Sequence, residues 1–165
     1  MAASDPHYIT GTLQIVPAKS LVTRAYAKFW TQLPFVQDGA VGAGLFCVNN
    51  AGRARWDKFP DIISDDTFVR LSFAPAERIE VPAQYHWPMI EGLRGLIKVR
   101  RRQDAGVKQV LDLYPALAKN DTKAKLTTGK LLKLMLAAPL GFLVYMTVHI
   151  FVRLRPPSEK WTRGR

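Results

Sequence analysis

Apolar and polar residues alternate along residues 8 to 16, YITGTLQIV, a segment that is also rich in β-branched side chains. A period of two predicts a strand, which Pro17 ends. Over residues 19 to 32 the apolar positions recur every three to four residues, which predicts an amphipathic helix ending before Pro34. Residues 39 to 44 are rich in glycine and predict a turn that leads into a short apolar strand at residues 45 to 49.

The middle of the chain predicts several shorter elements. Helices are expected at residues 50 to 56 and 65 to 73, and a short strand at residues 77 to 82. Residues 88 to 103 have an apolar side and a Lys/Arg side, which predicts an amphipathic helix, and a further helix is expected at residues 107 to 114. The fold class is therefore α/β. We interpret the helix at 88 to 103 as lying in a membrane interface, although an ordinary surface helix fits its pattern equally well.

The longest uncharged stretch is LMLAAPLGFLVYMTVHIFV, which begins at Leu134 and contains 19 residues. As a helix it measures roughly 28 Å, close to the hydrocarbon thickness of a bilayer. We predict one transmembrane helix over residues 131 to 153. The alternatives are a buried helix of a soluble protein and a re-entrant segment kinked at Pro139.

The charges divide the chain into two halves. Residues 1 to 90 carry 8 Lys/Arg and 8 Asp/Glu, whereas residues 91 to 165 carry 16 and 5, so the whole net charge of +11 lies in the second half. Because these basic residues bracket the apolar stretch and no nucleic-acid motif is present, membrane lipid is the expected partner and nucleic acid is not.

The organisation that follows has four parts: a globular part at residues 1 to 115, a basic linker at 116 to 130, the transmembrane helix and a basic tail at 154 to 165. The N-terminus lacks the basic and apolar regions of a signal peptide. We expect the protein at a membrane, inner or plasma, with the globular part in the cytoplasm. Basic residues on both sides of the apolar stretch leave its orientation open. One cysteine allows neither a disulfide framework nor a cysteine metal cluster.

An acidic pair, Asp65 and Asp66, stands at the predicted start of the helix at 65 to 73. Negative charge at this position satisfies free amide groups and favours the helix dipole, which is one explanation for the pair. A second is catalytic, because a carboxylate can accept a proton from an attacking hydroxyl. The glycine run before it lacks the Lys-Ser/Thr end of a phosphate-binding loop, so its glycines more simply allow a close approach of the backbone.

The stretch NNAGRARWDKFPDIISDD, ending at Asp66, and the later RRRQDAG, ending at Gly106, together resemble glycosyltransferase family 2. In that family a glycine-bearing strand leads to an acidic pair, and a Gln-x-x-Arg-Trp motif follows near the membrane. The resemblance implies that Asp66 is the general base and that Asp65 is the first acidic position. It also implies that Gly42 and Gly44 line the acceptor pocket and that Arg102 is the motif arginine. Val99 and Gln103 stand where the motif has Gln and Trp.

The resemblance implies a partial glycosyltransferase-A-type domain, the acceptor-side half, joined to a membrane segment. Its activity would be inverting sugar transfer from a nucleotide sugar to an acceptor hydroxyl. Members of the family use a divalent metal such as Mg or Mn, but the Asp-x-Asp motif that binds it is absent here, so we expect no metal ligand in this chain. A separate N-terminal half is then an expected partner. The alternative function is a non-catalytic, membrane-anchored accessory or truncated protein.

Overall fold

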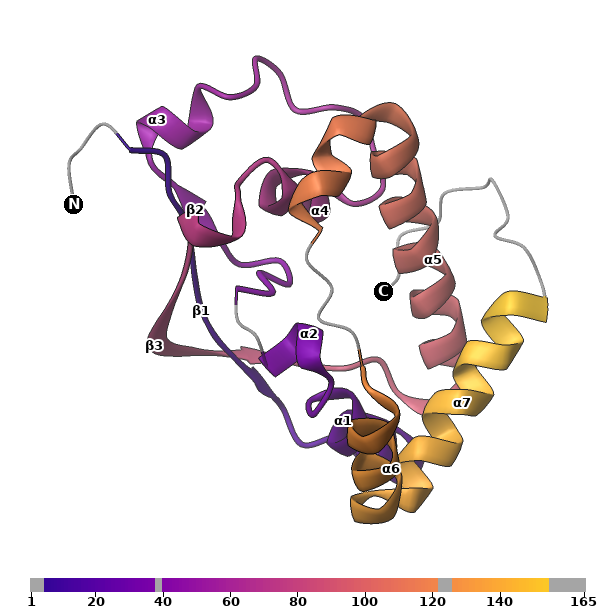
Figure 1. Ribbon diagram of the computed structural model, residues 1–165. Coiled ribbons are helices and arrows are strands. Elements are labelled where there is room, and N and C mark those ends of the chain that lie inside the picture. Colours follow the sequence, from indigo (N-terminus) through magenta and orange to yellow (C-terminus); the bar gives the residue numbers. More distant parts are fainter. Residues whose placement is uncertain (1–4, 38–39, 122–125, 155–165) are drawn as a thin grey trace.

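The computed structural model describes residues 5–37, 40–121 and 126–154 and has a mixed α/β fold (Figure 1). Its sheet has three strands in the order β2-β1-β3: β1 (Tyr8–Ile15), β2 (Cys47–Val48) and β3 (Arg78–Trp87). β1 pairs antiparallel with β2 and parallel with β3. The α-helices are α1 (Leu21–Trp30), α2 (Pro34–Gln37), α3 (Asn50–Arg53), α4 (Asp65–Leu71), α5 (Gly92–Leu113), α6 (Thr128–Ala137) and α7 (Pro139–Leu154), and two 3-10 helices are η1 (Pro75–Glu77) and η2 (Pro115–Asn120).

β3 is longer than the strand predicted at residues 77 to 82. Its register with β1 shifts between Gly11, opposite Val81, and Thr12, opposite Gln84, so Pro82 and Ala83 form a bulge. A proline cannot donate to a sheet, and the bulge removes it from the ladder so that the strand continues. Gly11 faces this bulge: a Cβ on Gly11 would lie 2.5 Å from the carbonyl oxygen of Ala83, so only glycine allows the backbones to come this close.

α5 is one continuous helix of 22 residues, whereas two helices were expected, at 88 to 103 and at 107 to 114. Gly106, near its middle, is buried and lies against Ser64, where a Cβ would come within 2.7 Å of the Ser64 Cβ. The apolar side of the first half of α5, represented by Leu93, Leu96 and Ile97, packs in a hydrophobic cluster with residues of α1 and α7. This is the arrangement of a helix packed on its own domain, the alternative that fits the pattern of these residues equally well.

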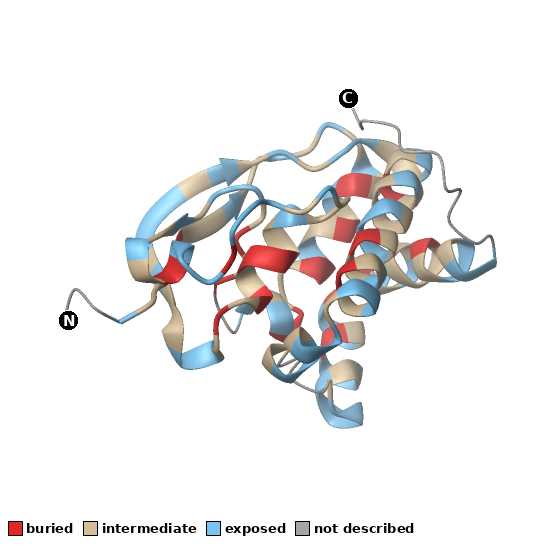
Figure 2. Ribbon diagram, turned by 90° about the horizontal axis from the view of Figure 1, so that it is seen from above, coloured by how far each residue is buried: buried red, intermediate tan, exposed pale blue. Residues whose placement is uncertain are grey.

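The interior consists of two hydrophobic clusters. The first contains Tyr8, Trp56, Phe68, Leu71 and Phe73 with Val110 of α5. The second is centred on Phe29, Trp30, Leu96 and Val148. Both clusters draw residues from β1 and α5, and Figure 2 shows the buried positions gathered where the helices meet one another and the strands.

The long apolar stretch does not form the single helix that we predicted over residues 131 to 153. α6 ends at Ala137, Ala138 has a non-helical backbone conformation and α7 begins at Pro139, at an angle of 117°. Proline suits the first position of a helix but prevents an incoming helix from continuing through it. In the described residues no single helix is long and apolar enough to cross a membrane, while α6 and α7 reach that length and composition only as a bent pair. The basic tail lies outside the described residues, apart from Leu154, as do residues 122–125 of the basic linker.

Candidate functional site

The acidic pair opens α4, as the sequence predicts, with Ser64 as the N-cap residue. Asp66 is half-buried, and its Oδ1 accepts hydrogen bonds from the Ser64 hydroxyl (2.8 Å) and the Thr67 backbone N–H (2.7 Å). Asp65 is exposed, and its Oδ1 accepts from the Asp66 N–H at 2.9 Å. Both carboxylates therefore satisfy amide groups at the helix start, which the helix dipole also favours.

The glycine run touches the core at Gly42, which contacts Tyr8 of β1. Gly42 is buried with φ +59°, and a Cβ at this position would overlap the hydroxyl group of Tyr8. Gly44 also has a positive φ, +76°, but it is exposed and nothing lies within 4 Å of where its Cβ would be. Of the two glycines expected in an acceptor pocket, Gly42 is thus in contact with the interior and Gly44 is at the surface.

The negative charge of Asp66 acts on two tyrosines, Tyr8 and Tyr85. Tyr8 is fully buried, and within the described residues its hydroxyl has no hydrogen-bond partner. Burial raises the pKa of Tyr8; the positive charge of Arg70 opposes this effect and the negative charge of Asp66 adds to it. Burial also raises the pKa of Tyr85, hydrogen bonding to Thr10 and to the Ala43 backbone opposes this, and the negative charges of Glu80 and Asp66 add to it. We call Tyr8, Gly42, Asp66, Arg70 and Tyr85 the Tyr8–Asp66 cluster.

Asp66 is the member of this cluster whose side chain can accept a proton from a hydroxyl-bearing ligand. Asp66 and Arg70 are four residues apart and share a face of α4. Tyr8 is fully buried and Nη2 of Arg70 lies 3.7 Å from Oδ1 of Asp121, so the half-buried Asp66 carboxylate is the acceptor that this face offers.

Arg102 and Gly106 are also four residues apart and share a face of α5. Gly106 contacts Ser64 directly, and the Ile63 N–H donates a hydrogen bond to Oε1 of Gln109 at 2.9 Å. This face of α5 therefore packs against the start of α4. Arg102 is exposed one turn before that contact. The structure therefore brings the arginine-bearing face of α5 next to the acidic pair.

The sequence reasoning missed both tyrosines and Arg70. A signal existed for Tyr8, because the alternation in β1 places it on the same side of the strand as Thr10, and both are buried. Tyr85 had no comparable signal, since its place beside β1 depends on the bulge at Pro82.

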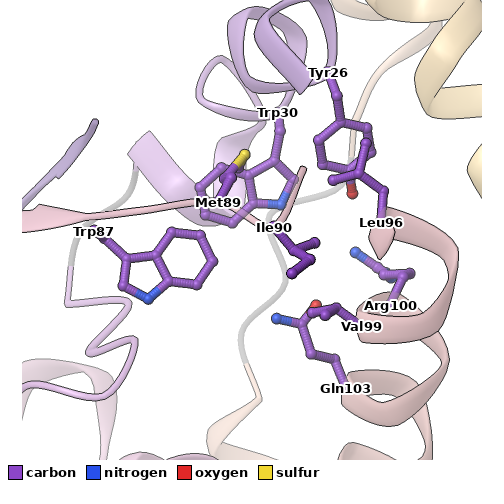
Figure 3. Close-up of a pocket in the computed structure, with 9 residues that line it drawn as sticks. All are labelled: Tyr26, Trp30, Trp87, Met89, Ile90, Leu96, Val99, Arg100 and Gln103. Carbon is purple, nitrogen blue, oxygen red and sulfur yellow. The ribbon is translucent and has the colours of Figure 1, made fainter. Parts of the chain in front are cut away.

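A small pocket lies elsewhere, between α1, the end of β3 and the first half of α5 (Figure 3). Its volume is about 30 Å³, room for one or two water molecules. It is lined by Tyr26, Trp30, Trp87, Met89, Ile90, Leu96, Val99, Arg100 and Gln103. Val99 and Gln103, which stand where the resemblance to glycosyltransferase family 2 expects Gln and Trp, therefore line this pocket.

The positive charge of Arg100, which lines the pocket, is paired with the negative charge of Asp104. Arg100 Nε lies 2.9 Å from Oδ1 of Asp104. Burial by itself lowers the pKa of Arg100, but Asp104, together with Tyr145 and Tyr26, outweighs it and raises this pKa. Burial raises the pKa of Tyr26 to about 12, with Arg100 opposing the shift. A neutral, water-sized pocket of this kind has no room for a sugar ring.

The divalent metal of the family does not fit the residues present. Across residues 5–37, 40–121 and 126–154, no group of three or more His, Cys, Asp or Glu side chains could hold a metal ion. We therefore derive no step through a metal in this chain.

Comparisons with protein-family models, with curated proteins and with solved structures found no significant match. The function is therefore argued from the residues of this chain and their geometry.

Proposed function

We propose that this chain is the acceptor-side part of a membrane-associated, inverting glycosyltransferase in which Asp66 is the general base. The observation that supports this proposal most strongly is the contact between α5 and the start of α4. Gly106 rests on Ser64, so two segments that the family resemblance treats as parts of one active site, the acidic pair and the arginine-bearing stretch, are neighbours here.

The reaction would use the residues of the Tyr8–Asp66 cluster as follows. The acceptor hydroxyl gives its proton to the Asp66 carboxylate while its oxygen bonds to the anomeric carbon of the sugar. The bond from that carbon to the nucleoside diphosphate breaks, and the diphosphate leaves with the electron pair. Cationic groups stabilise such a leaving group.

Among the three arginines at residues 100 to 102, Arg102 is best suited to stabilise the leaving diphosphate. Arg100 is paired with Asp104, and Arg101 donates to the carbonyl oxygen of Phe151 at 2.6 Å. Arg102 is exposed on the side of α5 that carries Gly106. The nucleotide itself and any metal would be bound by the separate half.

The sheet has an edge at which that half would add its strands. β3 has ten residues and pairs with β1 on one side, and among the described residues no strand pairs with its other side. An open edge of this length is a template for further strands.

The second candidate, a non-catalytic accessory protein, is favoured by a specific observation. Both carboxylates of the acidic pair accept hydrogen bonds from amide groups at the start of α4. A purely structural role would explain these residues without any chemistry. Under this alternative, titration of the chain with nucleotide sugars shows no metal-dependent binding.

The decisive experiment compares Asp66→Asn with Asp61→Asn, an exposed aspartate of the preceding loop. The chain is combined with a nucleotide-binding half that carries Asp-x-Asp, and transfer from labelled nucleotide sugars is measured in membranes. Because an Asn oxygen can still accept the Thr67 N–H, we expect Asp66→Asn to fold normally and to lose transfer by at least about a hundredfold. Asp61→Asn should leave transfer unchanged. Turnover retained by Asp66→Asn would reject the assignment of the base.

A further inference from the structure

The bent α6–α7 pair carries exposed apolar side chains on both helices. Six large ones have 49 to 71% of their surface exposed: Leu132 and Leu136 on α6, and Leu140, Leu143, Ile150 and Leu154 on α7. On α7 the spacing of these residues, 140, 143, 150 and 154, with Thr147 between, corresponds to one stripe of a helix. We call these six residues the α6–α7 apolar surface. An exposed apolar area of this kind on a folded protein marks a contact with a partner or a membrane.

The opposite side of α7 packs firmly inside the protein. A Cβ on Gly141 would lie 2.5 Å from the carbonyl oxygen of Ala25, and Val148 is 1% exposed in the second hydrophobic cluster. The helices that cover this side carry exposed charges of their own, Arg24 and Lys28 on α1 and Lys98 on α5. Figure 1 shows α7 beside α1 and α5, with its remaining side facing away from the molecule.

Basic residues accompany the α6–α7 apolar surface. Lys130 and Lys133 on α6 and Arg153 near the end of α7 are exposed, and the half of the sequence that contains them carries the entire net positive charge. Long basic side chains beside an apolar helix face suit a surface of anionic lipid, where their ammonium or guanidinium groups reach the phosphates.

We infer that the α6–α7 apolar surface inserts into a single leaflet of an anionic bilayer, so that the protein lies on the membrane rather than passing through it. This inference rests on the membrane association in the proposed function and specifies its surface. α6 and α7 measure about 15 and 24 Å and meet at 117°, so both can lie near the interface plane. If α7 crossed the hydrocarbon instead, the charged side chains of α1 and α5 would be drawn in beside it, which is costly.

Vesicle binding tests the surface. The full chain is mixed with vesicles of phosphatidylcholine alone, or with 30% phosphatidylglycerol added, and the bound fraction is measured by flotation. We expect binding to the anionic vesicles and at least tenfold weaker binding for the double variant Leu140→Glu, Leu143→Glu. Leu113→Glu is the matched control, because Leu113 is 57% exposed at the end of α5, away from this surface. Circular dichroism verifies that each variant is folded.

The double variant Lys130→Gln, Lys133→Gln tests the charge contribution without touching the apolar residues. We expect its binding to the anionic vesicles to fall about tenfold at low salt and its binding to neutral vesicles to stay unchanged. Equal binding of the wild type and the Leu140→Glu, Leu143→Glu variant to anionic vesicles would overturn the inference.

Labelling distinguishes one leaflet from a span. Cys47 is the one cysteine in the sequence and is exposed, so Cys47→Ser provides a background for a cysteine at Gly129 or at Arg153. With protein added to sealed vesicles, insertion in one leaflet leaves both positions open to an impermeant maleimide from outside. Protection of one of them by the vesicle shows a span and contradicts the inference.

A second copy of the chain, rather than lipid, could also cover this surface, and it would give a different result. A second copy predicts a dimer by light scattering without lipid, which Leu140→Glu dissociates, and no vesicle binding. Failure of the proposed function can be distinguished from failure of this inference. Asp66→Asn should bind vesicles like the wild type, whether or not transfer depends on Asp66.

Discussion

Gly42 and Gly44 share a left-handed backbone conformation but differ in their surroundings, which allows a matched comparison. Gly42→Ala adds a methyl group where the Tyr8 hydroxyl lies, whereas Gly44→Ala adds one in open space. We expect Gly42→Ala to lower the free energy of unfolding by about 3 kcal/mol, through backbone strain and overpacking together. Gly44→Ala should cost about 1 kcal/mol, through strain alone. Urea unfolding measures both; equal losses would contradict the contact with Tyr8.

Tyr8 provides a second prediction, because its hydroxyl is buried without a hydrogen-bond partner. Removing an unpaired buried polar group removes the cost of its desolvation, so we expect Tyr8→Phe to raise the free energy of unfolding by about 1 kcal/mol. A drop in stability for Tyr8→Phe would show that the hydroxyl has a partner in the folded protein.

At the scale of elements, the contact between α7 and α1 depends on a small residue. Gly141→Ala places a methyl group 2.5 Å from the Ala25 carbonyl oxygen. We expect it to lower the free energy of unfolding by about 2 kcal/mol, because backbone cannot move aside cheaply. Gly129→Ala in α6 is the control: nothing lies near it, so better helix propensity should add about 0.5 kcal/mol. Denaturant melts in mild detergent compare the two variants.

The connection between α4 and β3 contains Glu77, which forms an ion pair with Arg55. This ion pair predicts that the stability of the protein depends on pH. Nη1 of Arg55 donates to Oε2 of Glu77 at 2.8 Å, and the Ala74 N–H donates to the same carboxylate. The hydrogen bond from Arg55 lowers the pKa of Glu77 below its ordinary value near 4.5, although partial burial opposes this.

The unfolded carboxyl group therefore takes up its proton at a higher pH than the folded one, and acid favours unfolding. This stabilisation is complete above the unfolded pKa and is lost as the pH falls from about 4.5 through the lower folded pKa. We expect Glu77→Gln to be less stable than the wild type at pH 7 by about 0.5 kcal/mol, since the pair is partly exposed. The difference should shrink in acid; a difference that does not change between pH 7 and 3 would contradict the ion pair.

At the scale of the whole molecule, β1 and α5 connect the two hydrophobic clusters. Tyr8 of β1 and Val110 of α5 belong to the first, while Ile15 of β1 packs against the second, which contains Leu96 of α5. We expect one cooperative unfolding transition, in which Val110→Ala and Val148→Ala each lower the free energy of unfolding by about 2 kcal/mol. Fluorescence of single-tryptophan variants retaining Trp56 or Trp30 should report the same midpoint; separate midpoints would show that the clusters unfold independently.

The elements predicted from local pattern agree with the structure where their stabilising contacts are also local. β1, α1 and the start of α4 follow from alternation, helical spacing and an acidic residue at the first turn. Of the two glycines that the resemblance places in an acceptor pocket, Gly42 contacts the buried Tyr8 and Gly44 is at the surface.

Other features depended on partners far along the chain. β3 continues past Pro82 because β1 offers Gly11 opposite the bulge, and α5 continues through Gly106 because Ser64 occupies the space of a side chain. A short stretch of sequence reveals neither Gly11 as the partner of the bulge nor Ser64 as the partner of Gly106, because each contact joins segments that are tens of residues apart.

The sequence alone determined the mixed α/β class, the one-sided charge distribution and the apolar character of residues 134 to 152, because these depend on composition and local spacing. The tertiary structure decided which side of that apolar stretch is buried, where it bends, and which residues surround Asp66. The physical reason is that α1 and α5 can pack against only one side of α7. Because α7 is apolar on both sides, its own sequence does not distinguish the covered side from the exposed one.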